Sequence, residues 1–142
     1  MHSYDPLKTP DPDAWLQLDE VERIALVEKW HKGARIPLPN SKVHAIFHVI
    51  IENQLVEHIP EVEQAMVRLK MGGLDRHDSI HALATCATDE IWELSHGKNV
   101  DDSGEKHESY LRRVRAMTAQ KWLKEYRQDE DGDDDFEDDD ED

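Results

Sequence analysis

The sequence predicts an all-α protein, a single compact domain of about five main helices with a disordered acidic C-terminal tail. Apolar residues recur at the three- and four-residue spacings of amphipathic helices, and no segment alternates polar and apolar residues as a strand would. Proline, glycine and aspartate stand between the apolar segments, where helices begin and end. A length of 142 residues suits one domain.

The N-terminal part is predicted to hold an extended arm and two helical segments. Residues 1–10 form the arm, and a short helical turn at 11–16 follows it. Asp19, with Glu22 three residues later, has the spacing of a capping box at the start of the next helix. Gly33 is expected to end that helix, before a proline-containing loop.

Two long amphipathic segments flank a short one in the middle of the chain. The helix predicted at 41–58 has the most regular apolar spacing, with Val43, Ile46, Phe47, Ile50, Ile51 and Leu55. Pro60 begins a shorter helix that Gly72 ends. Asp75 can cap a further helix, which we expect at about 76–95.

The C-terminal part divides into a basic helix and an acidic tail. The last helix is predicted at 105–127, so the helical domain spans residues 11–127. Residues 128–142 carry 12 acidic side chains and no basic ones, and removing these from the net charge of −16 leaves −4 for residues 1–127. The tail repels itself and has little apolar surface to bury, so we expect it to be disordered.

Charge and composition argue against several classes of function. The mild negative charge of residues 1–127 argues against nucleic acid as the main partner. No stretch approaches the apolar length of about 18 residues that spans a membrane, and the N-terminus lacks a signal-peptide core. The single cysteine, Cys86, allows no intramolecular disulfide. We therefore expect a cytoplasmic protein, whose acidic tail could recruit a basic protein partner.

Paired histidines are the strongest functional signal in the sequence. His44 and His48 lie four residues apart, with Glu52 four residues further on the same predicted helix. His77 and His81 form a second pair on the helix predicted at 76–95. This spacing projects two imidazoles from one face of a helix, as ligands of a single ion require. Imidazole and carboxylate donors without thiolate suit zinc, iron or manganese, so we predict these five side chains as metal ligands.

A shared site depends on how the two helices pack. At about 100° per residue, each histidine pair lies on the same flank of its helix's apolar stripe. Facing helices bring the same flank together only if they run antiparallel. A plain up-down-up order of the helices between residues 41 and 95 would make the outer two parallel, unless the short middle helix crosses the bundle.

The second histidine pair also suggests an enzyme. His77-Asp78-Ser79-Ile80-His81 is the H-E-x-x-H pattern of zinc metalloproteases with aspartate in place of glutamate. Asp78 is then a candidate general base for a metal-dependent hydrolase, or it orients a histidine. Arg76 and His81 also have the Arg-x4-His spacing of HEPN-type ribonucleases.

A metal-free function is a further alternative. Histidines at the edge of an apolar stripe are often half-buried and hydrogen-bonded to carboxylates or backbone. In that case the histidines are structural, and the protein is an interaction module that recruits a partner through its tail or a helical face. The sequence does not decide between these hypotheses.

Several segments together resemble a known family. They are Asp11-Pro12-Asp13-Ala14-Trp15-Leu16, Leu18 to Ile24, His44 to Gln54 with its Glu-Asn-Gln end, and Gly73 to His81. They are similar to a family of small bacterial helical proteins grouped as a domain of unknown function. The resemblance covers about residues 11–95 and implies a helical fold without implying an activity. The family usually has glutamate at the position of Asp78, a departure that weakens the hydrolase hypothesis and leaves both histidines in place.

Overall fold

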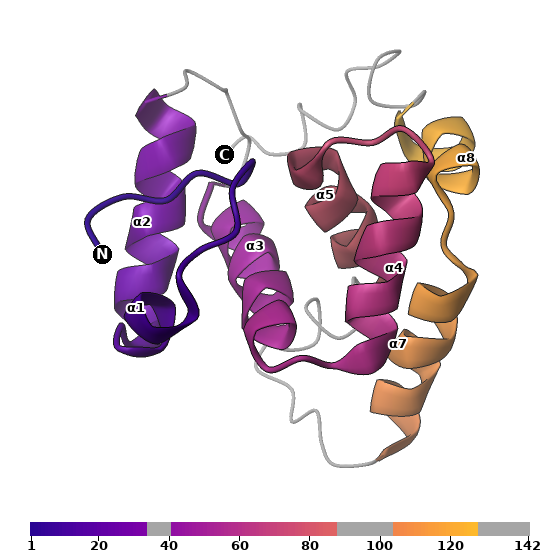
Figure 1. The fold of residues 1–142 in the computed structure, drawn as a ribbon, viewed down its shortest axis with the longest axis horizontal. Helices are drawn as coiled ribbons and strands as arrows, with labels where there is room; N and C mark the ends of the chain where they lie inside the picture. Colours follow the sequence, from indigo (N-terminus) through magenta and orange to yellow (C-terminus); the bar gives the residue numbers. More distant parts are fainter. Residues whose placement is uncertain (34–40, 88–103, 128–142) are drawn as a thin grey trace.

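The computed structural model describes residues 1–33, 41–87 and 104–127, and every regular element in these ranges is helical (Figure 1). The elements are α1 (Pro12–Leu16), α2 (Glu20–Gly33), α3 (Ser41–Val56), α4 (Pro60–Met71), α5 (Arg76–Cys86), α7 (Gly104–Ala116), α8 (Ala119–Trp122) and the π-helical turn η1 (Leu123–Arg127). The predicted all-α fold is therefore confirmed. No helix in these ranges is long and apolar enough to cross a membrane.

The predicted capping residues begin three of the helices. The Asp75 carboxylate accepts a hydrogen bond from the backbone N–H of Asp78, and α5 starts at Arg76, the residue after Asp75. Asp19 and Glu22 form the reciprocal pair of a capping box, with both bonds at 2.8 Å. Asp11 caps α1 in the same way as Asp75 caps α5. Local side-chain chemistry thus fixes where these helices start.

Three helices end earlier than their apolar patterns predict, and one of them is α5, which was expected to reach about residue 95 but ends at Cys86. Helix α3 stops at Val56, and His58 lies in the left-handed region with φ of 59°, a conformation that cannot continue a helix. The segment predicted as one helix at 105–127 is broken at Thr118, whose extended backbone and side chain cap α8. The predicted helix residues 88–95 and the acidic tail lie outside the described residues.

Arg68 of α4 stabilises the break after α7. Its guanidinium donates to the backbone carbonyls of Val114 at 2.9 Å and Met117 at 3.0 Å. Val114 lies in the last turn of α7, where its carbonyl also accepts from the Met117 N–H at 3.2 Å, and Met117 directly follows the helix. A side chain from another helix therefore adds hydrogen bonds to the end of the interrupted helix, a long-range contact that no local pattern could predict.

Helix α3 lies between α1 and α2 on one side and α4 and α5 on the other (Figure 1), and it links two apolar clusters. The first cluster joins the N-terminal arm, α1, α2 and the start of α3, and contains Tyr4, Trp15, Val27, Ala45 and Val49. The second joins the end of α3 with α4, α5, α7 and α8, around residues such as Ile51, Leu69, Leu83, Val114 and Trp122. Buried polar side chains on α3, His48 and Glu52, accompany the passage from one cluster to the other.

The Glu-Asn-Gln segment ties α3 to three different parts of the molecule. Glu52 accepts hydrogen bonds from Arg76 of α5 and from Tyr4 of the arm. The Asn53 side-chain oxygen accepts from the Trp15 indole and from Arg23, each at 2.9 Å. Gln54 accepts from the Tyr110 hydroxyl of α7. Each residue therefore holds a separate element against the central helix.

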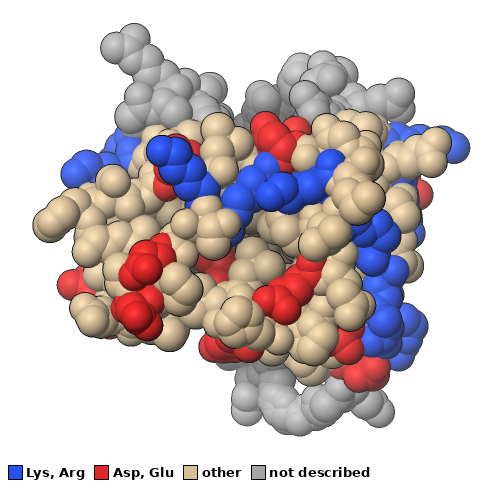
Figure 2. All heavy atoms as spheres, in the orientation of Figure 1, with Lys and Arg blue, Asp and Glu red and all other residues tan. Residues whose placement is uncertain are grey.

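Basic side chains of the last helices face solvent. Arg112, Arg113 and Arg115 are exposed on α7. Figure 2 shows Lys and Arg side chains gathered along the side where Figure 1 places this helix.

Candidate metal centre

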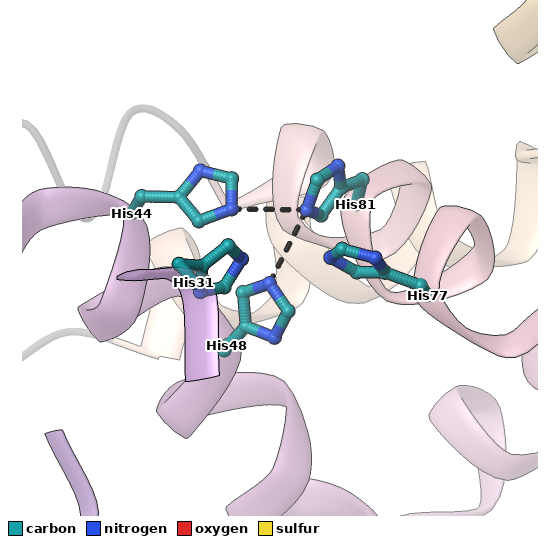
Figure 3. Close-up of side chains that lie close together, drawn as sticks. All are labelled: His31, His44, His48, His77 and His81. Atoms are coloured by element: carbon teal, nitrogen blue, oxygen red, sulfur yellow. Dashed lines mark hydrogen bonds between the residues drawn. The ribbon is translucent and has the colours of Figure 1, made fainter. Parts of the chain in front are cut away.

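Five histidines from three helices form one cluster in the described part of the molecule. They are His31 of α2, His44 and His48 of α3, and His77 and His81 of α5. Each can offer one ring nitrogen, and these five atoms lie within 4.8 Å of one another. Figure 3 shows a nitrogen of every ring directed toward a common centre. The cluster could therefore hold a metal ion, which is the feature that the paired-histidine pattern predicts.

The nitrogen spacing matches a metal coordination shell. His81 Nε2 lies 3.0 Å from His44 Nε2 and 3.2 Å from His48 Nε2. Imidazole nitrogens bind transition metals at about 2.1 Å, so neighbouring ligands of one ion are separated by about 3.0 Å at right angles and about 3.4 Å at tetrahedral angles. The three nitrogens thus stand almost as ligands of one ion would.

The contacts between α3 and α5 occur in the order that a shared metal site requires, because residues later in α3 contact residues earlier in α5. Near one end, the His44 ring packs against His81, and further along α3 the His48 ring packs against both His77 and His81. Glu52, a further turn along, reaches back to Arg76 at the start of α5. Residue numbers thus rise on α3 as they fall on α5, so that both histidine pairs meet on the same flank.

His31 joins the cluster from α2 because it continues the buried side of that helix. It lies one turn beyond Val27, which is fully buried, and His31 itself is 2% exposed. Its ring contacts those of His44, His48 and His77. In the sequence, the only indication of this role was that His31 occupies a position of α2 at which the apolar spacing predicts a core residue.

Hydrogen bonds outside the cluster fix which nitrogen of two rings faces inward. His31 Nδ1 lies 2.9 Å from the Val27 carbonyl oxygen, which can only accept, so Nδ1 carries the proton and Nε2 keeps its lone pair. The Tyr4 hydroxyl donates its single proton to Glu52 at 2.6 Å, so its oxygen accepts from His48 Nδ1 at 3.1 Å. His48 Nε2 therefore also presents a lone pair to the centre.

Burial and the charge of Glu52 hold Tyr4 in its protonated form. Both raise the pKa of the Tyr4 hydroxyl, and the residue as a whole is 3% exposed. The chain of hydrogen bonds from His48 through Tyr4 to Glu52 therefore has a defined direction. Carboxylates that orient metal-bound histidines through such contacts are common around metal sites.

In the described part of the chain, the interior of the cluster leaves buried ring nitrogens without hydrogen-bond partners. The Nε2 atoms of His31 and His77 are buried and have no hydrogen-bond partner among the described residues. Each close contact of His81 Nε2, to His44 and to His48, needs a proton on one of its two nitrogens. A buried acceptor without a donor is costly, so the cluster is well suited to a cation at its centre.

All five imidazoles are neutral near pH 7. Burial, followed by repulsion from neighbouring histidines, lowers the pKa of His44 to about 3 and places those of His48 and His81 well below the usual value. Burial likewise lowers the pKa of His77 to about 4 and reduces that of His31. Neutral imidazole is the form that binds metals, so the cluster is ready to act as a ligand set.

These depressed pKa values predict a metal-free protein that loses stability in acid. Because the unfolded histidines bind protons more readily than the folded ones, stability is complete above pH 6.5 and declines as the pH falls toward 4. His44 alone is expected to cost about 2 kcal/mol at pH 5. Urea denaturation in the presence of a chelator at pH 7.5 and pH 5 measures the loss, which should be smaller in His44→Gln. Equal stability at both pH values would contradict buried neutral imidazoles.

Glu52 lies outside the cluster, unlike the four histidines predicted with it. Its carboxylate is fully buried and accepts from Arg76 at 2.7 and 2.8 Å and from Tyr4 at 2.6 Å. The four-residue spacing places Glu52 one turn beyond His48 on α3, where its carboxylate pairs with the Arg76 guanidinium. Glu52 therefore supports a histidine through Tyr4 and does not face the centre.

The residues proposed for catalysis are also placed by the structure. Asp78 does not belong to the group of side chains that could share an ion. The charges of two other carboxylates, Asp75 and Asp5, act on His77. Arg76 is 6% exposed and is held by Glu52 and the Pro6 carbonyl, so its guanidinium is not free to contact a phosphodiester.

Comparison with known proteins adds no assignment. No family model, curated protein or solved structure matches the chain.

Proposed function

We propose that the protein binds one divalent transition-metal ion through His31, His44, His48, His77 and His81. The observation that carries the proposal is the convergence of five neutral ring nitrogens, among which the buried Nε2 atoms of His31 and His77 lack partners. A cation satisfies these acceptors together, whereas hydrogen bonds between the rings can satisfy only part of them.

The five imidazole donors favour iron over zinc and manganese. Imidazole suits zinc, iron, nickel and copper, while manganese is usually found with oxygen ligands. Structural zinc sites almost always have four ligands, and this cluster offers five. Of zinc, iron and manganese we therefore propose ferrous iron, with zinc bound by four of the five rings as the next choice.

The ion would connect α2 to α5, two helices that share few direct contacts among the described residues. His31 comes from α2 in the N-terminal apolar cluster, and the other rings come from α3 and α5. Within the described residues, side-chain contact between α2 and α5 includes the packing of His77 against Trp30 and His31. A structural role for the ion, a staple between α2 and the α3–α5 pair, follows from this position.

Metal content of the full-length, tag-free protein tests the proposal. The protein is treated with a chelator, reloaded with ferrous iron or zinc, desalted and measured by mass spectrometry. We expect about one ion per chain in the wild type and almost none in His77→Ala/His81→Ala. The matched control is His58→Ala/His107→Ala, which removes two exposed histidines outside the cluster and should keep the ion.

The comparison also accounts for the acidic tail. The tail is the same in all three proteins, so any ions that it binds loosely appear equally in each. Equal metal content in the three would assign binding to the tail, and its absence from all three would favour the metal-free interaction module.

Removing the Tyr4 hydroxyl is expected to weaken metal binding by about 10- to 100-fold. Tyr4→Phe keeps the ring that packs near Trp15, with centroids 5.9 Å apart, but frees His48 Nδ1 from its fixed contact. Competition with a coloured chelator measures the affinity, and circular dichroism checks the fold. An unchanged affinity in a folded variant would limit Tyr4 to a packing role.

A further inference from the structure

We infer that the ion in this centre takes a small monoanion as an additional ligand, an inference that rests on the proposed metal binding. The charges around the five histidines, and the number of ligands that these residues supply, both favour such a ligand.

The ligand set leaves the charge of a divalent ion uncompensated. In the described part of the chain, the group of side chains that could share the ion consists of histidines and contains no carboxylate. Glu52, whose buried carboxylate is linked to His48 by hydrogen bonds through Tyr4, forms an ion pair with Arg76 at 2.7 Å. This pair has no net charge. The Tyr4 hydroxyl between Glu52 and His48 keeps its proton and adds no charge.

Two positive charges in a buried site are unfavourable unless an anion accompanies them. Burial weakens solvation of the ion, and the low effective dielectric constant strengthens its attraction for any anion that can reach it. Sites with carboxylate or thiolate ligands supply that negative charge themselves. Here the carboxylates of Asp75 and Asp5 act on His77 only from outside the ligand set, so negative charge bound to the ion has to come as hydroxide, another small inorganic anion or the carboxylate of a small acid.

Coordination number and exposure leave room for such a ligand. The histidines supply five ligands, one fewer than the six that an octahedral metal ion accepts. His31 and His48 are buried, but His44, His77 and His81 are each partly exposed. A ligand of two or three atoms can therefore approach past the partly exposed rings, whereas a larger one meets Trp30, which packs edge-on against His31 and His77.

Cobalt(II) and azide provide the test on the full-length protein. Cobalt bound by histidines has visible absorption bands that change when its coordination changes. Azide added to the cobalt-loaded wild type should produce a saturable spectral change at millimolar concentration. Imidazole, a neutral ligand, should need at least a tenfold higher concentration to produce a comparable change, because only the anion offsets the charge of the ion.

A charge variant near the site checks the electrostatic argument. The negative charge of Asp75 acts on His77 and should oppose anion binding. Asp75→Asn keeps a side chain that can cap α5 and should bind azide about threefold more tightly, a modest effect because Asp75 is exposed. The control is Asp19→Asn, the same change at the cap of α2, about 18 Å along that helix from His31. Its azide affinity should not change.

The outcomes separate this inference from the metal proposal. If cobalt gives no bands that disappear in His77→Ala/His81→Ala, metal binding fails and this inference fails with it. If those bands are present but azide leaves them unchanged, the metal proposal survives and the additional anion is ruled out. Equal binding of imidazole and azide would show an open position without the predicted preference for an anion, and would also overturn the inference.

Discussion

Arg76→Met is expected to lower the free energy of unfolding by about 3–5 kcal/mol. Arg76 and Glu52 are 6% and 0% exposed, and two hydrogen bonds at 2.7 and 2.8 Å join them. Removal of the guanidinium leaves the buried carboxylate bonded to the Tyr4 hydroxyl, and it also removes the bond to the Pro6 carbonyl. Urea denaturation, followed by circular dichroism, measures the change.

The double variant Glu52→Leu/Arg76→Met separates charge burial from packing. Replacing both partners by apolar side chains leaves no uncompensated charge, so we expect most of the lost stability to return. Metal affinity should still fall, because Tyr4 then has no acceptor that fixes its contact with His48. A double variant as unstable as Arg76→Met would contradict the view that an unpaired carboxylate causes the loss.

Saturating metal is expected to raise the melting temperature by about 10–20 °C. A ligand present at 1,000 times its Kd stabilises the folded state by about 4 kcal/mol, and 1 kcal/mol corresponds to about 3–5 °C for a domain of this size. The effect should be large because the ligands come from α2, α3 and α5, so the site does not survive separation of these helices. Thermal denaturation with and without a chelator measures it.

The same comparison in His77→Ala/His81→Ala provides the control. This variant keeps α2, α3 and the acidic tail but lacks both α5 ligands, so metal should leave its melting temperature unchanged within about 2 °C. A similar increase in the variant and the wild type would show that the stabilising ions bind elsewhere.

Local sequence patterns predicted the helices because each carries its own signals. The regular apolar spacing of α3 and the capping carboxylates of Asp19 and Asp75 act within a few residues, so they can be recognised without knowing the fold. The break at Thr118 was not predicted, and one of the contacts that stabilise it comes from Arg68, which lies far away in the sequence and donates to the Val114 and Met117 carbonyls.

The site was predictable where its ligands occur as pairs on one helix. His44 with His48, and His77 with His81, have a spacing that indicates a common face. His31 stands alone on α2, and Tyr4 lies in an arm without periodicity, so their roles depend on tertiary packing. Glu52 shares the spacing of a third ligand, and only its long-range ion pair with Arg76 shows why it faces elsewhere.

X-ray absorption spectroscopy of the metal-loaded protein tests the five-histidine centre most directly. The proposed site predicts a shell of nitrogen ligands at about 2.1 Å, with the outer-shell scattering of four or five imidazole rings and no sulfur. At most one further light atom should be needed, in agreement with a small additional ligand. A shell dominated by oxygen without imidazole scattering would show that carboxylates, and not these histidines, bind the ion.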